Sequence, residues 1–138
     1  MPLLRVSGKR RPDLGVVDGR LTACPATPNC VCSDAADSNH RIDPLVLTVS
    51  ADEAWSVVRD AVSALPGAHI VSDGADYLHA ECESAVFRFV DDLELHLRPL
   101  EGVIAVRSAS RLGYFDLGAN RRRVERLRAR LIRLGMVR

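Results

Sequence analysis

The chain has 138 residues, 19 Lys and Arg against 18 Asp and Glu, and 47% apolar residues. This size fits one domain with a core that needs no metal or disulfide. The net charge of +1 indicates no particular partner. No apolar run reaches the roughly 18 to 20 residues of a membrane span.

The chain start, MPLLRVSGKRR, is basic and has no periodic pattern. We therefore expect residues 1–11 to form a mobile arm, and residues 12–138 to form a single domain. Because few apolar residues precede the basic cluster, this start does not form a secretory signal, and a cytoplasmic location is expected. A cell-envelope location is the alternative if an export or anchor segment precedes the given start.

Residues 12–44 are rich in Pro, Gly, Asp and Asn, which predicts either a long ordered N-terminal loop laid over the domain or a disordered leader. The apolar residues 45–49 then predict a short strand. Ser50 and Glu53 form a capping box that opens a helix with one apolar stripe, and Pro66-Gly67 ends that helix.

The middle of the chain after Pro66-Gly67 is predicted to be strand, with alternating apolar residues over 77–83, 86–98 and 103–110. A basic amphipathic helix closes the chain over about 117–134. The elements follow the order strand, helix, four strands, helix. Short links make consecutive strands antiparallel, and two helices can cover the apolar side. The sequence therefore predicts an α+β fold with an antiparallel sheet of about five strands and both helices packed on one face.

The cysteines allow several interpretations. Cys24, Cys30 and Cys32 with His40 form a loose zinc-like set, but their spacing differs from that of structural zinc sites, and no metal or other cofactor is expected. Cys24 and Cys30 could close a small disulfide loop in an oxidising compartment and would stay reduced in the cytoplasm. A nucleophilic Cys30 with His40 as its base is a further alternative. Cys82 is most simply a thiol in the core.

An acid–base pair is conceivable in the middle strands, where His79 and Glu81 share one side and Glu94 and His96 share one side of the next strand. The simpler interpretation is cross-strand charge pairing on a solvated sheet face.

Asp91 has the parity of the apolar positions Phe89 and Leu93, so it is expected to point inward unless a bulge resets the strand. An inward carboxylate needs a partner, and Arg107 or Arg111 are the expected ones. Replacing Asp91 should then be costly, whereas replacing Asp92 should not.

The strongest candidate site lies where the last strand passes through a Gly-bounded turn into the Arg-rich helix. Asp116 suits a helix N-cap, and amides at a helix start beside guanidinium groups would bind a phosphate or carboxylate. The alternative is a filled structural network. The expected ligand-binding residues are Arg107, Ser108, Ser110, Arg111, Tyr114, Asp116, Asn120 and Arg121, supported by Asn29, Cys30 and Asp91.

Four motifs resemble the bacterial and plastid family called domain of unknown function 1499: LGVVDGRLTACPATPNC, DYLHAECES, FVDDLEL and RSASR-x-GY-x-DLG-x-N. The resemblance covers residues 12–134 and implies that the N-terminal loop is ordered. Relatives often carry an export or anchor segment, and their cysteines match Cys24 and Cys30 but not Cys32. The family name implies no reaction.

These observations favour a non-enzymatic module that binds an anionic small molecule or a protein partner at the Arg107–Asn120 turn, with the Asn29–Cys30 loop as a lid. One alternative is an enzyme that uses His79 with Glu81, or Asp91, near the same turn. Another is a structural adaptor. Residues 118–138 carry eight Arg and one Glu, but the apolar stripe of this helix is needed by the core, so neither nucleic acid nor membrane is expected as a partner.

Overall fold

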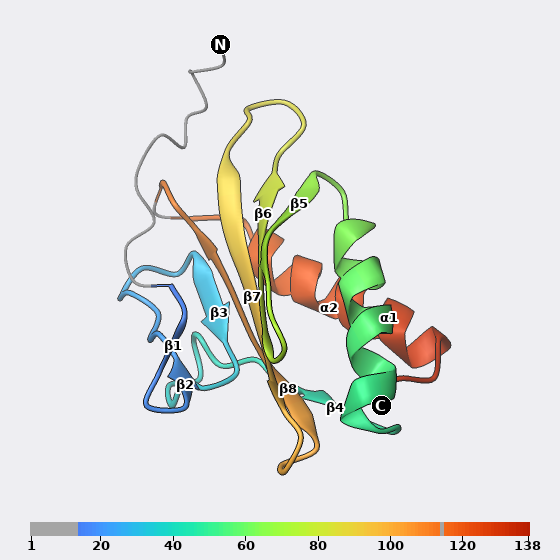
Figure 1. Ribbon diagram of the computed structural model, residues 1–138. Coiled ribbons are helices and arrows are strands. Elements are labelled where there is room, and N and C mark those ends of the chain that lie inside the picture. Colours follow the sequence, from blue (N-terminus) through green and yellow to red (C-terminus); the bar gives the residue numbers. More distant parts are fainter. Residues whose placement is uncertain (1–13, 114) are drawn as a thin grey trace.

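The computed structural model describes residues 14–113 and 115–138, so the predicted arm over residues 1–11 lies outside the described residues. The elements follow the predicted α+β order after a longer N-terminal part (Figure 1). They are β1 (Val16–Val17), β2 (Arg20–Leu21), β3 (Cys30–Cys32), β4 (Leu45–Val46), α1 (Ala51–Ser63), β5 (Ala68–Asp73), β6 (Tyr77–Glu83), β7 (Val90–Arg98), β8 (Val103–Ser110) and α2 (Ala119–Arg133).

The main sheet is antiparallel and, within the described residues, has six strands in the order β3-β8-β7-β6-β5, with β4 also beside β8. β7 pairs with β8 along the whole strand, while β3 and β4 share the other edge of β8. This arrangement confirms the predicted antiparallel sheet. The sequence pattern does not reveal β3, because its three residues follow a Pro- and Asn-rich stretch.

Two predicted boundaries are wrong for the same physical reason. β7 begins at Val90 instead of residue 86, because Arg88 has a left-handed backbone (φ 60°) that interrupts the extended chain. α2 begins at Ala119 instead of residue 117, because Leu117 and Gly118 are also left-handed (φ 55° and 81°). Residues 84–89, 111–113 and 115–118 therefore lie in loops.

Both helices pack on one face of the sheet (Figure 1). The predicted capping box is confirmed at α1, where the Ser50 hydroxyl accepts a hydrogen bond from the Glu53 amide at 3.2 Å. In the described part of the chain no helix has the length and apolar character needed to cross a membrane. The core on this face includes Trp55, Val58, Leu78, Cys82, Leu93, Leu95, Val106, Val124, Leu127 and Leu131.

The opposite face of the sheet is covered by the N-terminal segment that carries β1 and β2 (Figure 1). A small second core joins Leu21, Cys32 and Ala105 there. The polar side chains of this face are buried too, with His79 and Asp92 each 4% exposed. The prediction of a solvated face is therefore wrong, because the segment that covers it shows no strand pattern in the sequence.

Candidate ligand-binding site

The residues of the predicted site lie on two faces of the sheet. Successive residues of β8 alternate, so Ser108 and Ser110 face α2, whereas Arg107 and Arg111 face the N-terminal segment. The expected cluster of guanidinium groups around the start of α2 is thus absent from the described residues. Arg121 contributes nothing to it either, because its guanidinium donates to the carbonyl of Arg41.

Arg111 is already compensated by carboxylates. Its Nε and Nη2 donate to Asp92 at 2.8 and 2.9 Å, and Nη2 also donates to Glu81 at 2.6 Å. The hydrogen bonds to Asp92, and to a smaller extent the one to Glu81, raise the pKa of Arg111, although burial lowers it. Arg107 donates to Glu94 over 3.3 Å, and its buried Nε makes no hydrogen bond within the described structure.

His79 bonds to a residue that the sequence pattern does not single out. Its Nε2 shares a hydrogen bond of 2.7 Å with Asp92. Glu94 does lie beside His79 in the β6–β7 register, as the strand pattern allowed, but its carboxylate binds Tyr77 and Arg107 instead. Burial alone would raise the pKa of Asp92, but the hydrogen bonds from Arg111 and His79 hold this pKa below its usual range. Asp92 is therefore the centre of a buried charge network on the face opposite the helices.

Asp91 points inward, as its parity predicts, but its expected partners are wrong. The carboxylate lies 2.9 Å from Nη2 of Arg123, a residue of α2. The pairing of β7 with β8 continues through Asp91 and Asp92 without a bulge. Arg107 and Arg111 cannot reach Asp91, because they point to the other face of the sheet.

The carboxylate of Asp116 already binds the groups at the start of α2 that an anion would bind. One carboxylate oxygen accepts from the Gly118 amide at 2.8 Å, and the other accepts from the amide and the side chain of Asn120 at 3.1 and 2.8 Å. These bonds lower the pKa of Asp116 even though its burial opposes them. The N-cap position itself is Gly118, two residues later than predicted. The backbone amides of Gly118 and Asn120, which the sequence suggested for an added anion, are thus already bound by this carboxylate.

Asn120 is the centre of a filled hydrogen-bond network. It is fully buried, and its Nδ2 donates to Ser110 at 2.9 Å and to the backbone carbonyl of Asn29 at 3.2 Å. Its Oδ1 accepts from Ser108 at 2.6 Å and from Arg123 at 2.8 Å. These contacts support the structural interpretation of Ser108 and Asn120. Tyr114 lies outside the described residues.

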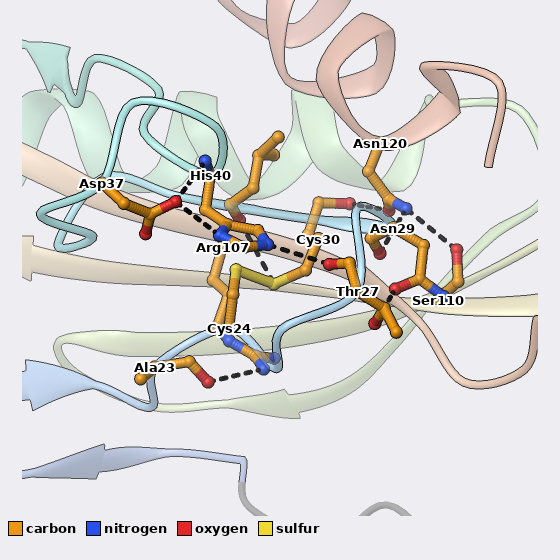
Figure 2. Close-up of a disulfide and its surroundings, with 12 residues drawn as sticks. Ala23, Cys24, Thr27, Asn29, Cys30, Asp37, His40, Arg107, Ser110 and Asn120 are labelled. Atoms are coloured by element: carbon orange, nitrogen blue, oxygen red, sulfur yellow. Dashed lines mark hydrogen bonds and ion pairs between the residues drawn. A yellow bond between two sulfur atoms is a disulfide. The ribbon is translucent and has the colours of Figure 1, made fainter. Parts of the chain in front are cut away.

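The Asn29–Cys30 loop contacts the turn, as Figure 2 shows for its contacts with Ser110 and Asn120. Asn29 donates from Nδ2 to the Gly113 carbonyl at 2.7 Å, and its own carbonyl accepts from the Ser110 amide at 3.0 Å. A disulfide joins Cys24 to Cys30 and closes this loop. It thereby holds Asn29 against the turn.

The disulfide removes two thiols from the zinc-like set, and it occupies the thiol of the alternative Cys30 nucleophile. His40 is engaged as well, by Asp37 at 2.8 Å and by the Thr27 carbonyl at 2.8 Å. The bond to Thr27 raises the pKa of His40. Among the described residues no group of three or more His, Cys, Asp or Glu side chains is placed to hold a metal ion.

A cavity of about 380 Å³, which we call the turn pocket, opens beside the hydrogen-bond network. Its walls come from the β6–β7 loop, the β8–α2 turn and the first turns of α2. Of the expected site residues, it includes Asp91, Ser110 and Asp116. The lining residues are Ser84, Phe89, Val90, Asp91, Ser110, Leu112, Gly113, Phe115, Asp116, Ala119 and Arg123.

The aromatic side chains at the turn pocket are the residues that the sequence interpretation missed. The chain has three phenylalanines, and Phe87, Phe89 and Phe115 are 66%, 46% and 71% exposed. Phe89 and Phe115 line the pocket, and Phe87 stacks on Phe89 with ring centroids 5.6 Å apart. Assigning Phe87 and Phe89 to a strand hid this signal, because the pattern then placed them in the core.

Fold and site together define a small α+β domain with a buried charge network on one face of its sheet and an apolar pocket at the β8–α2 turn. Residues 20–131 match the family model described as protein of unknown function DUF1499, and the chain belongs to that family. The resemblance seen in the motifs is thus confirmed. Neither a curated protein nor a solved structure matches the chain.

Proposed function

We propose that this domain is a non-enzymatic binding module whose ligand enters the turn pocket with an apolar group. The observation that carries the proposal is the exposure of Phe89 and Phe115 in the lining of one cavity, with the exposed Phe87 stacked on Phe89, while aliphatic residues supply most of the core. Exposed apolar patches next to a concave pocket mark ligand sites. The cavity volume of about 380 Å³ lies within the usual range for small ligands.

Backbone strain in both loops beside the pocket supports the same proposal. Arg88 in one loop and Leu117 in the other have left-handed backbones, which side chains with a Cβ rarely adopt. Such strain persists only where the surrounding structure enforces it, and it gathers at binding and catalytic sites. Here Arg88 directly precedes Phe89, and Leu117 follows Phe115 by two residues, and both phenylalanines line the cavity.

The polar groups in the turn pocket favour binding over catalysis. Asp91 is paired with Arg123, Asp116 accepts three hydrogen bonds at the start of α2, and Ser110 accepts from Asn120. Each of these groups already has a structural partner, so none of them is placed as an activated nucleophile or base.

The enzyme alternative expected from the sequence uses His79 with Glu81, or Asp91, but His79 is hydrogen-bonded to Asp92 on the other face of the sheet. Arg111 orients the Asp92 carboxylate, and Asp92 in turn holds the imidazole, an arrangement that suits general acid–base catalysis. The His79 side chain is 5% exposed, however, so a substrate would reach it only after the covering segment moved. The turn pocket is open without such a movement.

The disulfide favours a cell-envelope location over the cytoplasmic one expected from the chain start. Disulfides persist in oxidising compartments and are rare where glutathione and thioredoxin keep thiols reduced. Cys24 and Cys30 close a loop that contacts the proposed binding site. We therefore propose that the domain acts outside the reducing cytoplasm.

Titration with the neutral fluorophore N-phenyl-1-naphthylamine tests the proposed function. We expect a saturable rise in fluorescence that Phe89→Ala and Phe115→Ala each weaken, because the two rings form the apolar wall. Leu100→Ala is the matched control, since Leu100 is fully exposed on the β7–β8 turn, away from the pocket lining. Non-saturable binding, or an equal effect from Leu100→Ala, would contradict the proposal.

A further inference from the structure

A second, smaller hollow adjoins the turn pocket and is rich in arginine. Its volume is about 160 Å³, and it lies between the end of α1 and the first two turns of α2. Ala119 and Arg123 line both cavities, so the two are neighbours. We call it the arginine hollow, and its lining residues are Leu65, Pro66, Ala119, Arg122, Arg123 and Arg126.

Two of the three arginines in this hollow lack a carboxylate partner within the described residues. Arg123 is paired with Asp91, but Arg122 donates to the neutral carbonyl of Leu117 at 2.6 Å. The side chain of Arg126 makes no hydrogen bond or ion pair in the described part of the chain. The acidic residue of α2, Glu125, is bound to Arg128. Within the described residues, the arginine hollow therefore carries two guanidinium groups without a carboxylate partner, beside an apolar cavity.

The backbone of the turn holds Arg122 at this position. Gly118 has φ +81°, and a Cβ added there would lie 2.9 Å from Nη1 of Arg122. The guanidinium thus packs directly over a glycine, where a larger residue would displace it. Leu117, whose carbonyl accepts from Arg122, is the strained residue of the same turn.

We infer that the ligand is an amphipathic anion, with its apolar body in the turn pocket and its phosphate or carboxylate group in the arginine hollow. This inference rests on the proposed function and specifies its ligand. Guanidinium groups pair with phosphate and carboxylate oxygens through directed, charge-assisted hydrogen bonds. Phe89 and Phe115 supply the apolar contact, and Arg122 and Arg126 supply the charge. The sequence predicted an anion at Arg107 and Arg111, whereas we infer that the anion binds Arg122 and Arg126.

Calorimetric titration with octyl phosphate, octanol and inorganic phosphate tests the inference. We expect octyl phosphate to bind about tenfold more tightly than octanol, the gain typical of one hydrogen bond to a charged group. Arg122→Gln/Arg126→Gln should remove this difference and leave octanol binding unchanged. The control Arg130→Gln/Arg133→Gln makes the same change in net charge on exposed positions of α2 outside both cavities, and it should preserve the difference.

The outcomes separate the inference from the proposed function. If octanol and octyl phosphate bind equally well, or if both double variants lose the same amount of octyl phosphate affinity, the inference of an anionic ligand is wrong. The proposal of a binding module then still stands. Failure of all three probes overturns both. Inorganic phosphate that binds as tightly as octyl phosphate also overturns the inference, because the apolar body would then add nothing.

A sedimentation assay with vesicles that contain an anionic phospholipid identifies the source of the same chemistry. Vesicle binding that Arg122→Gln/Arg126→Gln abolishes supports a lipid headgroup as the bound anion. Binding of octyl phosphate without vesicle binding supports a free amphiphile instead.

Discussion

Asp91 and Asp92 are consecutive on β7, yet their carboxylates bind arginines on opposite faces of the sheet. Asp91 pairs with Arg123 of α2, whereas Asp92 accepts from Arg111 and His79 beneath the N-terminal segment. Side chains alternate along a strand, so two adjacent acids serve two separate layers. The sequence predicted that replacing Asp91 would cost more stability than replacing Asp92, and these partners reverse that order.

Asp92→Ala should destabilise the fold more than Asp91→Ala. The first change leaves Arg111 and His79 without their shared carboxylate in a buried site, which should cost roughly 3–5 kcal/mol. After the second change, Arg123 keeps its bonds to Ser108 and Asn120, so the cost should be about 1–3 kcal/mol. Urea unfolding measures both values, and a larger loss for Asp91→Ala would show that Asp92 is not the stronger anchor.

Stability should fall in acid partly because of Asp92. Its pKa in the folded state lies below the ordinary Asp value of about 3.9, so the carboxylate contributes full stability above that value. This contribution is lost as the pH falls through the lowered pKa. The free energy of unfolding of Asp92→Asn should therefore fall less steeply than that of the wild type across this acidic window, with the remaining loss due to other carboxylates of lowered pKa such as Asp34 and Asp116. Identical pH profiles for the two proteins would exclude Asp92 as a source of the acid sensitivity.

Gly67→Ala should be among the costlier glycine substitutions. Gly67 has φ +71°, and an added Cβ would meet the Glu83 carbonyl oxygen at 2.1 Å. Gly102 has nearly the same φ, +68°, but open space around it. Gly102→Ala should cost about 1 kcal/mol from the backbone alone, and Gly67→Ala about 3 kcal/mol, because the collision adds to it. Thermal unfolding of the pair isolates the collision, and equal losses would show that the Glu83 backbone moves aside.

Removal of the disulfide should affect both stability and the turn pocket. Cys24→Ser/Cys30→Ser should cost about 2 kcal/mol, because the cross-link closes a short loop. Asn29, which that loop holds, would also contact Gly113 of the pocket wall less firmly. We therefore expect weaker N-phenyl-1-naphthylamine binding. Dithiothreitol should reproduce both effects in the wild type and change nothing in the double variant; unaltered probe binding would uncouple the loop from the pocket.

Local sequence determined the parts of this protein that depend on neighbours along the chain. The Ser50–Glu53 capping box starts α1, and alternation along β7 puts Leu93 and Leu95 in the core and turns Asp91 inward. The antiparallel order follows from the short links between strands. These features need no knowledge of distant residues, because capping and strand parity act over a few positions.

Tertiary structure alone decided what faces each side of the sheet and which charges meet. The segment before β4 contacts Glu94 and Arg107 although it has no strand pattern of its own. Helix α2 brings Arg123 to Asp91 across 32 positions of sequence. For the same reason, the candidate site lies at other residues than the sequence predicted. Strand parity separates Arg107 and Arg111 from the start of α2, while the folded loops bring Phe89 and Phe115 to one cavity. Such contacts depend on the packing of segments distant in sequence, which no local pattern encodes.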